Sequence, residues 1–206
     1  MPLLIVGSGR CGTKSAAAAL GGTHEPYSEV LVPAATHLTL GLRSLGDTVS
    51  LLGSLAPLPE VSAHYRHAEL LPAWRIIYPD LKVLWLTRDK PPTVASMIRN
   101  RWYDPRSDDE WPVLFAGWRW ANGNGALVLE TPHNPWRLNP VLLGETAWGE
   151  YRWWPQGWRC DWWVSWSDRL CRSVFDARLD VTELEAGLPE IGEWAGVEVG
   201  EVPHLV

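Results

Sequence analysis

The chain has 206 residues and is poor in phenylalanine, methionine and cysteine, with two, two and three residues of each kind. Its cysteines, Cys11, Cys160 and Cys171, include no Cys-x-x-Cys pair, so neither a disulfide framework nor a zinc site is expected. No apolar stretch approaches the ~20 residues of a membrane span, and the apolar run at 2–6 is too short for a signal peptide. We therefore expect a cytoplasmic protein without membrane partners.

Acidic residues outnumber basic ones, with 24 Asp and Glu against 18 Lys and Arg, which gives a formal net charge of -6. This balance argues against a nucleic-acid partner or an anionic membrane bound through bulk electrostatics. Hydrophobic residues make up 46% and charged residues 20% of the chain, near globular averages. At ~100 to 200 residues per domain, residues 1–206 are expected to form a single domain.

Tryptophan is the residue in excess, with 15 copies, of which twelve lie between residues 102 and 166. Because Phe is rare, Trp is expected to supply most of the aromatic core and any aromatic binding surface. Five tryptophans lie in a stretch rich in Gly, Pro and Asn, about 122–160, which predicts an irregular insertion. They are candidates for a lid over an acceptor: Trp136, Trp148, Trp153, Trp154 and Trp158.

The chain opens on the pattern of a parallel α/β sheet. Residues 3–6 are all apolar, typical of a strand buried on both faces, and a glycine-rich turn follows at once. Residues 15–20 are alanine-rich and precede Gly21 and Gly22, which predicts a helix with a glycine stop. Strand, glycine turn and helix in this order indicate an α/β fold with a central parallel sheet.

Further elements follow from the same patterns. A second buried strand is predicted at 81–87, and the prolines after it favour the start of a helix that runs to about Arg101. An apolar residue at every fourth position predicts a helical face made of Trp162, Trp166, Leu170 and Val174. The other expected elements are loops with one helix within 31–60, helices at 68–78, 111–121 and 188–195, and a strand at 177–181.

The segment Gly7-Ser8-Gly9-Arg10-Cys11-Gly12-Thr13-Lys14-Ser15 joins the first strand to the first helix. Glycines let the backbone approach an anion, and the Arg10 and Lys14 cations with the neighbouring hydroxyls can donate to its oxygens. The pattern predicts a phosphate cradle. An ordinary tight turn is the alternative, which the added basic and hydroxyl residues disfavour.

A Walker A loop fits this segment poorly. Counting from Gly7 places Gly12 correctly, but Thr13 then occupies the lysine position and Lys14 comes one residue late. The second strand ends in Thr87-Arg88, which offers no acidic group for magnesium.

Two motifs together resemble the sulfotransferases that use 3′-phosphoadenosine 5′-phosphosulfate. The family's first loop, which binds the 5′-phosphosulfate, carries a basic residue, a small residue, Gly and Thr, matched here by residues 10–13. Its second motif binds the 3′-phosphate with an Arg at a strand end and a Ser eight residues later, matched by Arg88 and Ser96. The segment Asp180-Val181-Thr182-Glu183-Leu184 also resembles a family strand that leads into an acidic-Leu turn.

The resemblance implies a P-loop-like three-layer fold and a set of residues that bind the donor nucleotide. That set is Ser8, Gly9, Arg10, Cys11, Gly12, Thr13, Lys14, Ser15, Arg88 and Ser96. Cys11 is interpreted as a small loop residue rather than a thiol with a lowered pKa. The sequence departs from the family at 16–19, which lacks the aromatic residue that stacks on adenine in many relatives, and at 122–160, which matches nothing in it.

Sulfuryl transfer requires a base for the acceptor proton and positive charge near the departing phosphate. Arg10 and Lys14 suit the second role, so no metal is expected. The segment Gly22-Thr23-His24-Glu25-Pro26 resembles the His-Glu placement in bacterial and phage-like members, which implies Glu25 as base. His24 and His64 are the alternatives, and pairing of His64 with His67 on a metal lacks a third ligand.

The sequence therefore predicts a sulfotransferase acting on a hydroxyl or amine of a small-molecule or glycan acceptor, with an oligomeric state left open. Two other functions stay open at this point. One is a P-loop nucleotide or small-molecule kinase, which magnesium-dependent ATP binding would reveal. The other is a non-catalytic carbohydrate-binding protein that uses tryptophan platforms for sugar faces.

Overall fold

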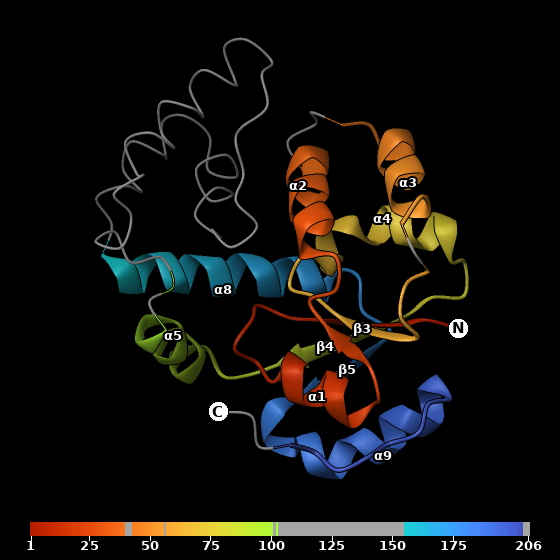
Figure 1. Cartoon of the computed structure of the whole chain (residues 1–206). Helices are drawn as coiled ribbons and strands as arrows, with labels where there is room; N and C mark the ends of the chain where they lie inside the picture. Colours follow the sequence, from red (N-terminus) through yellow and green to blue (C-terminus); the bar gives the residue numbers. More distant parts are fainter. Residues whose placement is uncertain (40–42, 56, 101, 103–154, 204–206) are drawn as a thin grey trace.

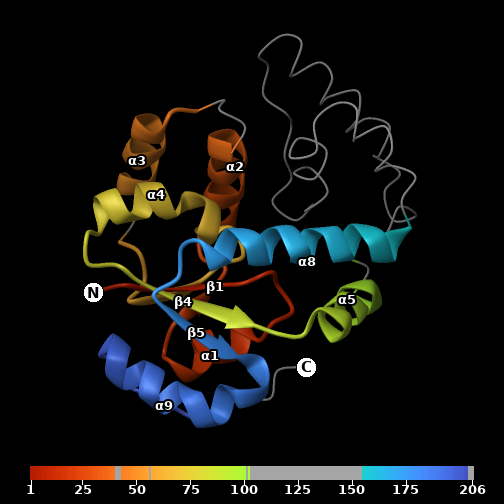
Figure 2. The same cartoon turned by 180° about the vertical axis from the view of Figure 1, so that it is seen from behind.

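A computed structural model describes residues 1–39, 43–55, 57–100, 102 and 155–203 (Figures 1 and 2). Five parallel strands form one sheet in the order β2-β3-β1-β4-β5. The strands are β1 (Leu3–Val6), β2 (Thr23–His24), β3 (Val61–Ala63), β4 (Lys82–Thr87) and β5 (Ala177–Asp180). The helices are α1 (Thr13–Ala19), α2 (Ser28–Thr39), α3 (Leu45–Gly53), α4 (His67–Ile77), α5 (Lys90–Arg99), α8 (Gln156–Arg172) and α9 (Leu184–Ala195), with a 3-10 turn η2 (Val181–Glu183).

Helices cover both faces of the sheet, which gives three layers (Figure 1). β1 lies at the centre and sends alternate side chains to opposite faces. Leu3 and Ile5 pack with α1 and α9, whereas Leu4 and Val6 pack with α2 and α4. All four residues are buried. The expected α/β class with a central parallel sheet, of the P-loop-like three-layer kind, is confirmed.

Because all five strands are parallel, their carboxyl ends lie at the same edge of the sheet. β1 pairs with β3 on one side and with β4 on the other, so the connections from β1 to β2 and from β3 to β4 run in opposite directions. In open parallel sheets, ligands bind at the carboxyl ends of the strands near such a reversal. The glycine-rich loop that follows β1 lies at this position.

Two regions of the fold differ from the sequence-based expectation. Residues 31–60 contain most of α2 and all of α3, rather than loops with one helix, and β3 follows directly at Val61–Ala63. β2 and β3 have two and three residues, too few to show a periodic pattern. α9 begins at Leu184, four residues before the expected start, and α5 ends at Arg99.

The buried face of α8 is also displaced from the predicted one. The side chains that α8 buries belong to Cys160, Trp163, Val164, Ser167 and Cys171. The residues predicted to form the buried face are, by contrast, only half-buried: Trp162, Trp166, Leu170 and Val174. The chain places tryptophans at both 162 and 163, so a spacing of four does not decide which of them faces the core.

The predicted irregular stretch ends earlier than expected, because α8 begins at Gln156. The rest of that stretch, up to residue 154, and the expected helix at 111–121 lie outside the described residues. Among the helices that are described, none is both long and apolar enough to cross a membrane.

Gly21 and Gly22 end α1 for different physical reasons. Gly21 has φ of +66° and no atom within 4 Å of the place a Cβ would take. A Cβ on Gly22 would lie 2.5 Å from Val61 Cβ and 2.6 Å from Val61 O, in β3. Gly21 thus permits the left-handed turn, while Gly22 permits close contact with the sheet.

We predict that Gly22→Ala destabilises the protein more than Gly21→Ala. The clash with β3 is expected at the upper end of the ~1 to 3 kcal/mol that overpacking costs. The left-handed backbone at Gly21 costs an alanine roughly 1 to 2 kcal/mol. Urea unfolding followed by tryptophan fluorescence measures both, and an equal or smaller effect at Gly22 would contradict the close contact.

Candidate functional site

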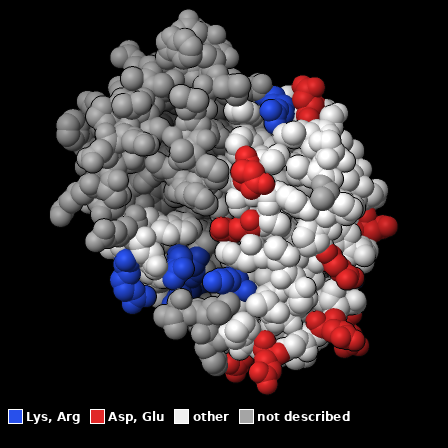
Figure 3. All heavy atoms as spheres, in the orientation of Figure 1, with Lys and Arg blue, Asp and Glu red and all other residues white. Residues whose placement is uncertain are grey.

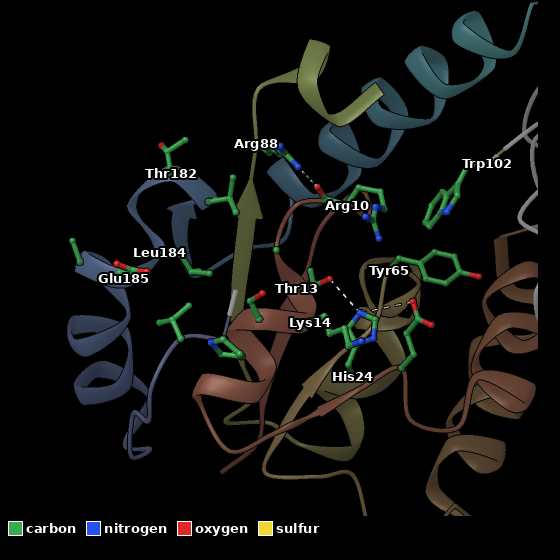
Figure 4. Close-up of a pocket in the computed structure, with 18 residues that line it drawn as sticks. Arg10, Thr13, Lys14, His24, Tyr65, Arg88, Trp102, Thr182, Leu184 and Glu185 are labelled. Atoms are coloured by element: carbon green, nitrogen blue, oxygen red, sulfur yellow. Dashed lines mark hydrogen bonds and ion pairs between the residues drawn. The ribbon is translucent and has the colours of Figure 1, made fainter. Parts of the chain in front are cut away.

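A cavity of about 990 Å³ lies at the carboxyl ends of the strands (Figure 4). Residues that follow each of the five strands line it. After β1 these residues are Gly9, Arg10 and residues 12–15. After the other strands they are Glu25 (β2), Tyr65 (β3), Arg88 (β4), and Val181 and Thr182 (β5). Its size lies at the upper end of the ~300 to 1,000 Å³ common for small-molecule sites.

The loop after β1 has a left-handed backbone at three positions. Gly9, Arg10 and Gly12 have φ of 80°, 56° and 85°. Glycine is needed at two of them for space as well, since a Cβ on Gly9 would lie 2.8 Å from the Trp102 ring and one on Gly12 would lie 2.6 Å from Val181. The loop is thus enclosed by residues from distant parts of the chain.

α8 holds the beginning of this loop. The indole Nε1 of Trp163 donates to the carbonyl of Ser8 at 2.8 Å, and both residues are buried. A buried carbonyl without its donor costs about 1 to 3 kcal/mol. Trp163 therefore has a role in shaping the loop in addition to its apolar packing.

The two predicted phosphate motifs contact each other. Arg10 Nε donates to Ser96 Oγ on α5 at 3.1 Å. Arg88 Nη1 donates to the carbonyl of Arg10 at 3.1 Å (Figure 4). Residues separated by 78 to 86 positions along the chain are thereby joined at one end of the cavity, where two guanidinium groups lie beside the glycine-rich loop.

Most of the predicted nucleotide-binding residues line the cavity: Gly9, Arg10, Gly12, Thr13, Lys14, Ser15 and Arg88. Ser8, Cys11 and Ser96 are buried beside it and do not line it. Burial raises the pKa of the Cys11 thiol to about 11, so this group is protonated at neutral pH. Cys11 is therefore a packed small residue, as expected from the sequence.

Positive charge gathers around this cavity. Lys and Arg side chains form a group near α5 and α1 on the face shown in Figure 3, while Asp and Glu side chains are scattered over other parts of that face. Among the described lining residues, Arg10, Lys14 and Arg88 are cationic and Glu25 and Glu185 are acidic. An anion placed beside the three cationic residues would be attracted although the chain as a whole is acidic.

His24 and Glu25 lie together at the cavity wall. His24 Nε2 lies 3.4 Å from Thr13 Oγ1 and 3.9 Å from Glu25 Oε1. Burial lowers the pKa of His24, with Lys14 acting in the same direction and Glu25 opposing it. The Glu25 side chain keeps 41% of its surface exposed. A neutral imidazole and a carboxylate, both able to accept a proton, therefore face the same cavity.

His64, the third candidate base, does not line the cavity. It is fully buried, with Nδ1 accepting from the Arg66 N–H at 3.0 Å and Nε2 lying 3.1 Å from Ser28 Oγ. His67 Nε2 lies 2.8 Å from Ser62 Oγ, and burial lowers the pKa of His67 to about 3. Within the described residues, no group of three or more His, Cys, Asp or Glu side chains is placed to hold a metal ion.

The structure adds lining residues that the sequence analysis did not assign to the site. Tyr65 and Trp102 lie on the side of Arg10 and His24 (Figure 4). On the other side the cavity is lined by the start of α9 and by Val202 and Pro203. No motif marks these residues, although Val181, Thr182 and Leu184 belong to the late segment that resembles the sulfotransferases. Of the predicted lid tryptophans, Trp158 is 64% exposed on α8, and the other four lie outside the described residues.

Asp180 fixes the wall formed by η2 and α9. Its Oδ1 accepts from the backbone N–H of Thr182 at 3.0 Å and from Thr182 Oγ1 at 2.7 Å. Its Oδ2 accepts from Thr87 Oγ1 at 3.1 Å, which joins the ends of β4 and β5. The hydrogen bond from the Thr182 backbone is the main reason that the pKa of Asp180 is lowered.

Comparisons with known proteins do not assign the chain to a family. No family model matches the chain, and no curated protein sequence matches it significantly. The crystal structure of a sulfotransferase from Alicyclobacillus acidocaldarius is similar over 100% of this chain and 86% of its own, with a TM-score of 0.44 and 14% sequence identity.

We predict that Asp180→Ala lowers the free energy of unfolding by about 1 kcal/mol at pH 7, the usual effect of losing a capping side chain. Because the folded pKa is lowered, the Asp180 carboxylate stabilises the fold above the unfolded pKa of ~3.9, and this contribution is lost as pH falls through the folded pKa. The difference between variant and wild type should therefore shrink in acid. Urea unfolding at pH 7 and pH 3 tests this, with the exposed Asp80→Ala as control; a difference that is unchanged at pH 3 would contradict the assignment.

Proposed function

We propose that the protein is a sulfotransferase that takes its sulfuryl group from 3′-phosphoadenosine 5′-phosphosulfate. The observation that carries this proposal is the contact between Arg10 and Ser96, with Arg88 bonded to the Arg10 carbonyl. It joins the loop expected for the 5′ end of the nucleotide to the Arg and Ser expected for its 3′-phosphate, at one end of a cavity that Arg10 and Arg88 line and that Ser96 lies beside. The three cationic lining residues also fit a ligand that carries several negative charges.

When bound, this nucleotide supplies an activated sulfuryl group that an acceptor hydroxyl or amine attacks in line, with the adenosine bisphosphate as leaving group. Arg10 and Lys14 line the cavity beside the glycine-rich loop and can stabilise negative charge that develops there. Thr13 and Ser15 add hydroxyl donors from the same segment. Positive groups fixed before the reaction avoid the cost of reorganisation during it.

Glu25 is proposed to take the acceptor proton. Its carboxylate lines the cavity, is partly exposed, and lies next to a histidine whose lowered pKa keeps it neutral at pH 7. His24 is the second candidate for the same role, because it shares this wall and bonds to Thr13 in the loop. The acceptor is proposed to be a small molecule or glycan with a free hydroxyl or amine.

We predict that the protein binds 3′-phosphoadenosine 5′-phosphate and that Arg88→Ala weakens this binding by at least about tenfold, the scale of a charge-assisted hydrogen bond. Arg88→Lys should also weaken binding, because an ammonium group cannot replace the planar fork of a guanidinium. Arg75→Ala is the matched control, since Arg75 forms an exposed ion pair with Asp176 and does not line the cavity.

Isothermal titration calorimetry measures these affinities, with magnesium-ATP as the competing ligand. Failure of the wild-type protein to bind the adenosine bisphosphate would contradict the proposal. Tight magnesium-dependent binding of ATP in its place would favour a kinase.

We predict that Glu25→Gln removes at least about 99% of turnover, within the range that a general base contributes, and leaves the affinity for the adenosine bisphosphate unchanged. The amide keeps the size of the side chain but cannot accept the proton. Release of inorganic sulfate from the donor, with water as acceptor, provides a readout that needs no identified acceptor. Full turnover in Glu25→Gln together with loss in His24→Gln would move the base to His24.

A further inference from the structure

The turn that carries Glu25 has an unusual backbone. Glu25 and Tyr27 both have positive φ, 54° and 56°, on either side of Pro26. A left-handed conformation costs a residue with a side chain roughly 1 to 2 kcal/mol, so neighbouring groups must hold it in place. Such strained residues often lie where function needs a fixed geometry.

Both backbone groups of Glu25 are held by hydrogen bonds. Its N–H donates to the carbonyl of Ala63, at the end of β3, at 2.7 Å. Its carbonyl accepts from the hydroxyl of Ser28, the first residue of α2, at 2.9 Å. The position of Glu25 therefore depends on one strand and on one serine side chain.

The direction of each bond in this group can be assigned from the donors present. The backbone N–H of Arg66 can only donate, so His64 Nδ1 must be the acceptor of their 3.0 Å bond. A neutral imidazole then carries its proton on Nε2 and donates it to Ser28 Oγ, 3.1 Å away. The Ser28 hydroxyl keeps its own proton for the Glu25 carbonyl. Each donor in the series has one acceptor.

We infer that Ser28 and His64 are positioning residues for Glu25, through the relay from the Arg66 N–H to His64, from His64 to Ser28, and from Ser28 to the Glu25 carbonyl. The inference rests on the proposed role of Glu25 as base. In this relay His64 acts through Ser28 and is not itself the acceptor of the substrate proton, because both of its nitrogens are engaged and its side chain is buried outside the cavity.

The surroundings of His64 favour the neutral form that the relay requires. Burial is the main cause that lowers its pKa well below the usual value, and the nearby His67, Arg66 and His24 act in the same direction. A proton added to Nδ1 would face the Arg66 N–H, so a charged imidazolium would lose that bond. The surroundings of His64 therefore keep it in the neutral form that donates to Ser28.

A first experiment tests the relay without any acceptor or nucleotide. Nitrogen-15 NMR of labelled histidine distinguishes a protonated ring nitrogen from an unprotonated one. We expect His64 in the tautomer with the proton on Nε2 at pH 7. A proton on Nδ1, or an imidazolium at that pH, would overturn the inference.

A second experiment tests positioning through kinetics, with water as acceptor and release of inorganic sulfate as the signal. Ser28→Ala should lower kcat by about 10- to 100-fold, the cost of a small misplacement of a catalytic group. The affinity for the adenosine bisphosphate should stay within about twofold, because no nucleotide contact is removed. Ser28→Thr keeps the hydroxyl and should restore most of the rate.

Ser54→Ala is the matched control. Ser54 is another serine that donates to a backbone carbonyl, that of Leu51, but it lies at the end of α3 away from the cavity. It should leave kcat unchanged. If Ser28→Ala has the full rate while Glu25→Gln is inactive, the positioning inference is wrong and the proposed base stands. If Glu25→Gln is fully active, the proposed base itself is wrong.

His64→Gln separates positioning from direct proton transfer. Glutamine retains an amide that can donate toward Ser28, so partial activity is expected. Complete loss of turnover in His64→Gln, while Ser28→Ala keeps the full rate, would show that His64 acts without Ser28 and would overturn the inference.

Discussion

The bond between Arg10 and Ser96 determines how the site is assembled, because it connects the loop after β1 to α5. Arg88 completes the connection by donating to the Arg10 carbonyl. Two arginine residues from distant parts of the chain therefore meet at the same loop, and the positive charge of each would attract an anion bound there. Other elements complete the site. Trp163 and Trp102 enclose the loop from other parts of the chain, and the ends of all five strands line one cavity.

Backbone strain is concentrated where the proposed chemistry takes place. The non-glycine residues with positive φ in the described part of the chain are Arg10, Glu25 and Tyr27. Arg10 and Glu25 line the cavity, and Tyr27 belongs to the turn that carries Glu25. Each such residue costs free energy that the surrounding packing must offset. The two proposed functions of these residues, binding of the leaving phosphate and removal of a proton, both require side chains that are fixed before the ligand arrives.

The sequence predicted the parts of the fold whose signal is local. The buried strands at 3–6 and 81–87 are continuous apolar runs, and the glycine-rich loop between strand and helix has a clear chemical pattern. β2 and β3 are too short for such a signal. Because tryptophans stand at both 162 and 163, the spacing of apolar residues did not identify the buried face of α8. The contact of Ser28 with His64 spans 36 positions and exists only because β2 pairs with β3, so no local pattern could reveal it. No local pattern predicts the burial of His64 either.

The most direct test of the account is a crystal structure of the protein soaked with 3′-phosphoadenosine 5′-phosphate. The account predicts the 5′-phosphate against the loop of residues 7–15, within reach of Arg10 and Lys14, and the 3′-phosphate next to Arg88 and Ser96. Glu25 should face the space in front of the 5′-phosphate, where an acceptor would stand. A nucleotide bound elsewhere, or bound with its two phosphates exchanged between these positions, would contradict the account.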